Sequence, residues 1–126
     1  MDMSSTVLVV EDDRVIRELL TETLATDGFN VVDAADGAEA LKLAEQPSLR
    51  IRQCMVLLDM QLPVVDGLFV LRRLERSHPD LPIIAMSASS SHLKAAEQAG
   101  AIATLAKPFE LVDVLAAVDH HCKMPE

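Results

Sequence analysis

The feature that most constrains the fold of this chain is the repeated alternation of short apolar runs with segments of helical periodicity. The first run, Thr6–Val10, is continuously apolar and rich in β-branched residues. Such a run is typical of a strand buried on both faces, as strands in parallel sheets are. Four further strands are predicted, at Asn30–Ala34, Cys54–Leu58, Pro82–Met86 and Ala101–Ala106.

Each predicted strand is followed by a segment with helical features. The pattern is clearest in the last segment, where Leu111, Val114, Leu115 and Val118 recur at the spacing of one helix face. The other helices are predicted after Asp13 and at residues 38–45, 67–77 and 93–99, and residues 87–91 are predicted to form a polar loop. Five βα units predict an α/β fold with a doubly wound parallel sheet. We expect one domain over residues 1–126, with its core at about 6–120 and short flexible tails.

Composition argues against several classes of function. The net charge of −9 should repel nucleic acids and anionic membranes. Only 2% of the residues are aromatic, which leaves no set of rings on which single-stranded nucleic acid could stack. No apolar run is long enough for a membrane span, and the start of the chain does not have the features of a signal peptide. Cys54 is interpreted as a small buried hydrophobic residue, and the two cysteines, Cys54 and Cys122, fit a protein of the reducing cytoplasm.

Polar and charged side chains stand where the predicted strands end. Glu11, Asp12 and Asp13 follow the first strand, and three single residues follow the third, fourth and fifth strands: Asp59, Ser87 and Lys107. Each of them has an ordinary structural explanation, and Asp13 is a plausible helix N-cap. Because ligands of open parallel sheets bind at the carboxyl ends of the strands, we expect the set to converge on one site.

Several neighbouring carboxylates would repel one another unless a cation offsets their charge. Oxygen ligands favour Mg²⁺, which commonly shares its coordination with phosphate oxygens. An aspartate can act as the nucleophile in phosphoryl transfer, while a lysine and a metal ion neutralise charge. The sequence therefore predicts a site for magnesium-dependent phosphorylation of an aspartate.

From about Thr6 to Ala117 the sequence resembles a response-regulator receiver domain of two-component signalling, of the chemotaxis-regulator type. The resemblance implies a flavodoxin-like (βα)5 fold with five parallel strands in the order 2-1-3-4-5. The matching segments are Val9–Asp13, Val56–Pro63, Asp66–Gly67, Pro82–Ala88, Ala99–Ala101 and Leu105–Phe109.

The resemblance assigns Asp59 as the phosphoacceptor in a reaction that needs Mg²⁺, with Mn²⁺ as a possible substitute. The implied direct metal ligands are Asp12, Asp59 and the backbone carbonyl of Gln61, while Glu11 would act through a water molecule. The donor would be a histidine kinase or a histidine phosphotransfer protein. The target would be an unidentified downstream protein, without direct binding to nucleic acid or membrane.

Two further assignments concern the phosphoryl group itself. The resemblance implies that Lys107 pairs with a phosphoryl oxygen, that Ser87 bonds to the phosphoryl group and moves on activation, and that the peptide bond before Pro108 is cis. One departure from the family pattern affects the switch, because Thr104 stands where many members carry an inward-turning aromatic residue.

Two intervals also depart from the family pattern. The interval from Ser87 to Gly100 is short, which predicts a short fourth helix or a short loop before it. The interval from Asp36 to Asp59 is long and contains Arg50 and Arg52. Both differences concern the expected output surface and leave the predicted pocket intact.

Two alternatives remain beside the phosphoacceptor hypothesis. The first is a receiver-like scaffold that phosphorylation does not control. The second is an aspartyl-phosphate hydrolase, although the general acid of that family would stand at Gln61. A dinucleotide-binding protein would need a glycine-rich loop after the first strand, where this chain is acidic. Apart from its own phosphorylation and dephosphorylation, we expect the chain to catalyse no reaction.

Overall fold

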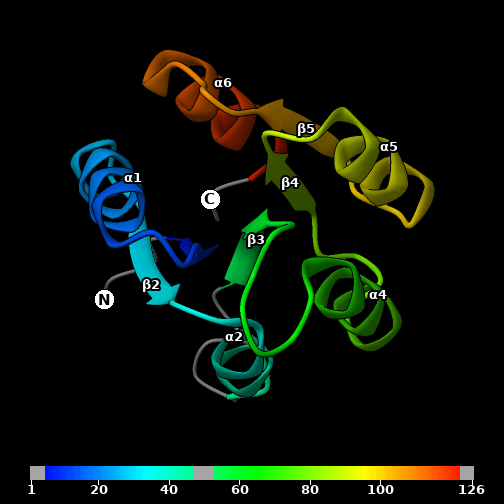
Figure 1. Cartoon of the computed structure of the whole chain (residues 1–126). Helices are drawn as coiled ribbons and strands as arrows, with labels where there is room; N and C mark the ends of the chain where they lie inside the picture. Colours follow the sequence, from blue (N-terminus) through cyan, green and yellow to red (C-terminus); the bar gives the residue numbers. More distant parts are fainter. Residues whose placement is uncertain (1–4, 47–52, 123–126) are drawn as a thin grey trace.

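The computed structural model describes residues 5–46 and 53–122, in which strands and helices alternate (Figure 1). The strands are β1 (Thr6–Val10), β2 (Asn30–Ala34), β3 (Gln53–Asp59), β4 (Ile83–Ser87) and β5 (Ala103–Ala106). The helices are α1 (Arg14–Thr26), α2 (Gly37–Ala44), α4 (Gly67–Ser77), α5 (Ser90–Gln98) and α6 (Leu111–His121). The predicted bounds of β1, β2 and α4 are confirmed.

The strands form one parallel sheet in the order β2-β1-β3-β4-β5, which confirms the expected fold class and strand order. One irregularity interrupts the pairing of β1 with β3. Thr6 lies opposite Gln53, whereas Val7 lies opposite Met55, so that Cys54 is an extra residue in β3. A bulge of this kind redirects the side chain of the inserted residue.

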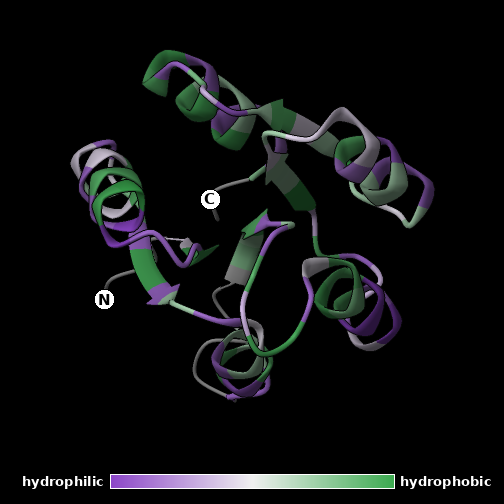
Figure 2. Ribbon diagram, in the orientation of Figure 1, coloured by the Kyte–Doolittle hydropathy of each residue, from purple (hydrophilic) through white to green (hydrophobic). Residues whose placement is uncertain are grey.

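Helices cover both faces of the sheet (Figure 1), and the hydrophobic segments in Figure 2 include the central strands. Leu8, Val56 and Ala85 pack on the face that α2, α4 and α5 cover. Val7, Leu57 and Ile84 pack on the opposite face, with buried residues of α1 and α6. Because successive strand residues point to opposite faces, both sets must be apolar, which explains the continuous apolar runs.

Short polar side chains begin four of the five described helices. The side chain of Asp13 accepts a hydrogen bond from the Ile16 N–H at the start of α1, which confirms its predicted capping role. Ser89 caps α5 in the same way, by accepting from the His92 N–H. The prediction of a polar loop over 87–91 and a helix from Leu93 is therefore wrong, since α5 already begins at Ser90.

The short interval before Gly100 thus reflects a brief β4–α5 connection of two residues, Ala88 and Ser89. Arg50, Arg52 and most of the predicted tails lie outside the described residues. At the C-terminal end the predicted core boundary is too early, since α6 includes His121 and Cys122 is buried. No helix in residues 5–46 and 53–122 is long and apolar enough to cross a membrane.

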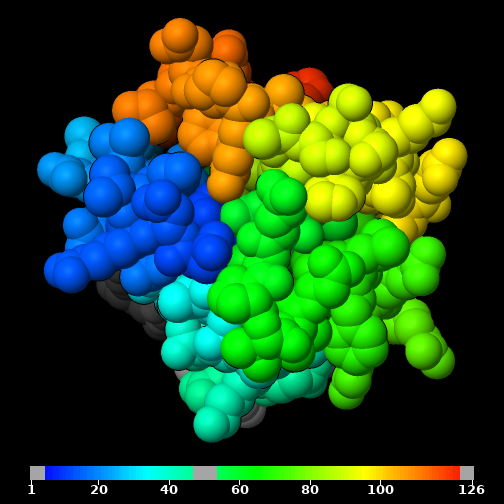
Figure 3. All heavy atoms as spheres, viewed as in Figure 1, coloured from blue at the N-terminus to red at the C-terminus, as the bar shows by residue number. Residues whose placement is uncertain are grey.

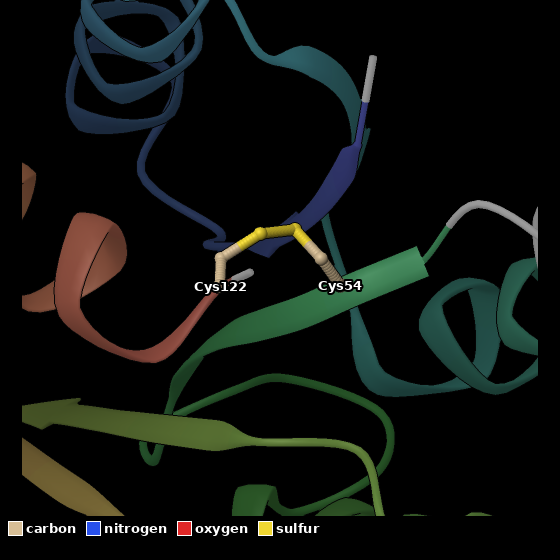
Figure 4. The surroundings of a disulfide bond; sticks show 2 residues. All are labelled: Cys54 and Cys122. Atoms are coloured by element: carbon tan, nitrogen blue, oxygen red, sulfur yellow. A yellow bond between two sulfur atoms is a disulfide. The ribbon is translucent and has the colours of Figure 1, made fainter. Parts of the chain in front are cut away.

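The two cysteines differ from the sequence-based interpretation. Cys54 and Cys122 are joined in a disulfide, with their Cα atoms 5.1 Å apart (Figure 4). The interpretation of Cys54 as an unpaired buried thiol is therefore wrong. The reason is tertiary, because the partner lies 68 positions further along the chain, at the end of α6.

Candidate functional site

The parallel sheet gathers the predicted site residues at the carboxyl edge of its strands. Asp59 is the last residue of the central strand β3, and Ser87 is the last residue of β4. Glu11 directly follows β1 and Lys107 directly follows β5. In Figure 3 the blue N-terminal, green and orange parts of the chain meet near the centre of the view.

Three carboxyl groups form a compact acidic cluster at this edge. Glu11, Asp12 and Asp59 each offer an oxygen, and these atoms all lie within 4.8 Å of one another. Glu11 is 0% exposed and Asp59 is 2% exposed, whereas Asp12 is exposed. The cluster is therefore open to solvent on the side of Asp12.

Lys107 bridges the two buried carboxylates. Its Nζ lies 2.6 Å from Glu11 Oε1 and 3.1 Å from Asp59 Oδ2. Backbone groups hold the other oxygens, since the Gln61 N–H donates to Asp59 Oδ1 at 2.9 Å and the Asp13 N–H donates to Glu11 Oε2 at 3.1 Å. Both carboxylates are thus fixed from two sides before any ligand binds.

The electrostatics of the cluster reflect its burial. Burial raises the pKa of Glu11 to about 7, the hydrogen bond from Lys107 opposes this rise, and neighbouring Asp59 adds to it. Burial alone would lower the pKa of Lys107, but its hydrogen bonds and the charges of Glu11 and Asp59 outweigh burial, and the pKa is raised above 10.5. The lysine therefore stays charged at neutral pH.

The donor set fits a hard divalent cation. The site contains three carboxyl groups and only one ammonium group, that of Lys107, so acidic groups are in excess. Two of the three carboxyl groups, those of Glu11 and Asp59, are buried. A cation with oxygen ligands would offset their negative charge. Glu11, Asp12 and Asp59 form an acidic pocket that could bind a metal ion.

Ser87 lies at the same edge but is linked to the cluster through backbone. Its carbonyl accepts from the Lys107 N–H at 2.9 Å, and its Oγ accepts from the Ser89 N–H at 3.0 Å. Thr104 lies within β5, opposite Ala85, and is half-buried. The Lys107–Pro108 peptide bond is cis, as the resemblance implied.

Arg17 contributes to the site although sequence reasoning did not single it out. Its guanidinium donates to the carbonyl of Glu11 at 2.8 Å and pairs with Asp33 at the end of β2 at 3.1 Å. This contact fixes the backbone that carries Glu11 and Asp12. The only local signal is a basic residue in the first turns of a helix, which is too common to indicate a site.

Gly67 is required by close backbone packing beside the site. A Cβ atom at this position would lie 2.5 Å from the Cα of Met60 and 2.8 Å from the carbonyl oxygen of Asp59. Real Cβ atoms do not approach this closely, so only glycine allows α4 to begin against the segment that follows β3. The Asp66–Gly67 pair noted in the sequence thus combines a helix cap with a steric requirement.

Comparisons with known sequences agree with this geometry. The family described as the response regulator receiver domain matches residues 7–119. The response regulator MprA of Mycobacterium ulcerans (strain Agy99) is 41% identical over 116 residues, which cover 90% of this chain and 48% of that protein. Response regulator MprA of Mycobacterium leprae (strain TN) is 40% identical over 114 residues, covering 89% and 48%. The chain therefore spans about half the length of these curated relatives.

Solved structures give the same result. A CheY-like response regulator receiver domain protein from Methanospirillum hungatei JF-1 superimposes with a TM-score of 0.85 at 26% identity, covering 93% of this chain and 92% of that one. A structure described as a putative response regulator from Chloroflexus aurantiacus J-10-fl has a TM-score of 0.83 at 30% identity, covering 93% and 96%. Together with the match over residues 7–119, these similarities show that the chain belongs to the response regulator receiver domain family.

Proposed function

We propose that this chain is a phosphoacceptor receiver domain in which Asp59 accepts a phosphoryl group. The observation that carries the proposal is the position of Asp59, which is buried at the end of the central strand, paired with Lys107, and adjacent to Glu11 and Asp12. The proposed donor is the phosphohistidine of a histidine kinase or histidine phosphotransfer protein, in keeping with the family.

In the proposed reaction an Asp59 carboxylate oxygen attacks phosphorus and the bond between phosphorus and the donor imidazole nitrogen breaks. The electron pair of that bond leaves with the imidazole, and the product on Asp59 is an acyl phosphate. Such transfers depend mainly on positioning and charge neutralisation. The Gln61 N–H orients the nucleophile, and Lys107 is near enough to pair with an oxygen of the arriving phosphoryl group.

Asp12, Asp59 and the backbone carbonyl of Gln61 would hold Mg²⁺ or Mn²⁺ directly, with Glu11 acting through water. When bound, the ion supplies neutralisation of negative charge on the phosphoryl oxygens. The proposed switch uses Ser87, whose hydroxyl would turn from the Ser89 N–H to the phosphoryl group and draw the β4–α5 connection with it.

The remaining parts of the proposal concern the setting of the domain. Residues 1–126 form a single receiver domain, located in the cytoplasm. It binds a downstream protein and contacts neither nucleic acid nor membrane directly. It catalyses only its own phosphorylation and dephosphorylation, as a signalling switch.

Incubation with acetyl phosphate and Mg²⁺, followed by intact-mass measurement, tests the phosphoacceptor role. The wild-type protein should gain the mass of one phosphoryl group, and only when Mg²⁺ is present. The Asp59→Asn variant should gain none. Asp13→Asn is the matched control, because Asp13 caps α1 outside the cluster and asparagine also caps helices. Equal labelling of wild type and Asp59→Asn would refute the role of Asp59. No labelling of the wild type would favour the alternative, a receiver-like scaffold that phosphorylation does not control.

A further inference from the structure

The disulfide between Cys54 and Cys122 links strand β3 to the end of helix α6. Cys54 lies near the start of β3 and Cys122 directly follows α6 (Figure 4). The Cα separation of 5.1 Å is within the range that a disulfide spans. The bond therefore fixes the C-terminal end of the last helix to the central strand.

The bulge in β3 makes this bond possible. Along a regular strand Cys54 would point away from the face that Met55 occupies. Because Cys54 is the extra residue in the pairing with β1, it packs instead against the same core as Met55, the core that α1 and α6 cover. The bulge thus turns the Cys54 side chain toward α6.

Cys122 extends the buried stripe of α6. Val114 and Val118 are the buried residues of this helix, and Cys122, four positions later, is 3% exposed. At the C-terminal end of α6 the Cys122 N–H donates to the Val118 carbonyl at 2.8 Å. Helix ends fray unless they are held, so the disulfide is a strong restraint on the last turn of α6.

We propose that Cys54 and Cys122 form a reversible redox pair that fastens the end of α6 when oxidised and releases it when reduced. The inference rests on the proposed cytoplasmic location and does not depend on phosphoryl transfer. In a cytoplasm kept reducing by thiols, disulfides are typically transient or redox-sensing. Cys54 is half-buried, whereas Cys122 is buried, so Cys54 is the more accessible sulfur for thiol exchange.

The exchange step balances with a dithiol reductant. One thiolate of the reductant attacks the Cys54 sulfur, the bond between the two protein sulfurs breaks, and Cys122 leaves as a thiolate that takes a proton. The second thiol of the reductant then attacks the mixed disulfide and releases Cys54. Two electrons pass to the protein and the reductant becomes a disulfide. Glutathione disulfide reverses the process through the same type of exchange.

The redox pair and the phosphorylation site lie at opposite ends of β3. Asp59 follows Cys54 by five positions of the strand, which is about 16 Å at the usual rise per residue. The oxidation state should therefore alter the end of α6, while the geometry around Asp59 is kept.

The first experiment measures the bond in the full chain. The protein is equilibrated in mixtures of reduced and oxidised glutathione, quenched with excess iodoacetamide in concentrated urea so that the buried Cys122 is also reached, and weighed intact. Both cysteines should become alkylated together, in one reversible two-electron transition within the range of reducing mixtures. If Cys54 and Cys122 stay unlabelled in millimolar reduced glutathione, the disulfide is a permanent structural bond. If both cysteines are still labelled after treatment with glutathione disulfide, the disulfide does not form. Either result overturns the proposal.

The second experiment measures α6 by hydrogen exchange. Amides of its last turn should exchange about tenfold faster after reduction, and those next to Asp59 should change less than about twofold. Reoxidation should restore slow exchange in the wild type but not in Cys54→Ser/Cys122→Ser, the matched control locked in the open state. Identical exchange of the oxidised and reduced wild type would overturn the proposal, whether or not the double variant folds. Asp59 labelling by acetyl phosphate is the separate readout of the proposed function.

Discussion

Substituting Glu11 with glutamine, without metal, tests how burial governs the charge of the acidic cluster. Glu11 is fully buried and its folded-state pKa is raised to about 7 from 4.5, chiefly by burial. Between these two values the folded protein holds a proton that the unfolded chain has lost. Linkage then requires the free energy of unfolding to fall as pH rises from about 4.5 through 7.

The magnitude follows from the size of the shift. The pKa differs by 2.5 pH units between the folded state and the reference value. Each unit corresponds to about 1.4 kcal/mol, so the stability that this one group removes over that range is at most on the order of 3 to 4 kcal/mol. The pKa of Lys107 is raised above 10.5, so the lysine stays charged throughout and adds no slope of its own.

Glutamine keeps an acceptor oxygen but does not ionise, so Glu11→Gln should lose this pH dependence. The quantity to measure is the free energy of unfolding of the variant minus that of the wild type. Urea unfolding in EDTA, followed by circular dichroism between pH 4.5 and 8, should show this difference increasing by up to roughly 3 to 4 kcal/mol. A constant offset from the altered hydrogen bond to Lys107 does not affect the slope.

Glu18→Gln is the matched control, because Glu18 is exposed and pairs only with Arg14 on the surface of α1 among its described contacts. Its difference from the wild type should stay flat with pH. If the Glu11→Gln difference is flat as well, or decreases as pH rises, the reasoning fails. Such a result would mean that pairing with Lys107 outweighs burial and that Glu11 is ionised at low pH in the folded protein.

Three further substitutions or ligands test other parts of the structure. Arg17→Met should lower the free energy of unfolding by about 1–2 kcal/mol, because a charged donor to the backbone is lost; urea unfolding checks this against Arg14→Met, whose exposed pair should contribute less than about 0.5 kcal/mol. Val64, at φ 69° and 82% exposed, is a β-branched residue in a conformation that asparagine tolerates. Val64→Asn should therefore raise stability by about 1 kcal/mol, and a lower melting temperature would contradict this. Structures with and without beryllofluoride and Mg²⁺ should show the connection after Ser87 moving with little change at Thr104; a large displacement of Thr104 beside a static Ser87 would contradict the proposed switch.

Local sequence signals were sufficient for the fold class and for the convergence of the candidate site, whereas the strand order and the role of each site residue came from the family resemblance. The apolar run Thr6–Val10 requires two covered faces, and strict alternation with helices leaves a parallel sheet as the solution. Since parallel strands end at one edge, Glu11, Asp59 and Lys107 could be expected together before any coordinates were known. The distances of 2.6 Å and 3.1 Å that Lys107 makes with the two carboxylates agree with that expectation.

Other features were decided only by the tertiary structure. One of them is the start of α5, because Ser89, Ser90 and Ser91 are all adequate N-caps by residue type, and in the structure it is Ser89 that accepts from the His92 N–H. The pairing of Cys54 with Cys122 depends on a bulge in β3 and on where α6 ends, two features without a local sequence signal. Periodicity and capping act over a few neighbouring residues, whereas contacts between distant segments depend on strand register and helix placement, which the whole fold determines.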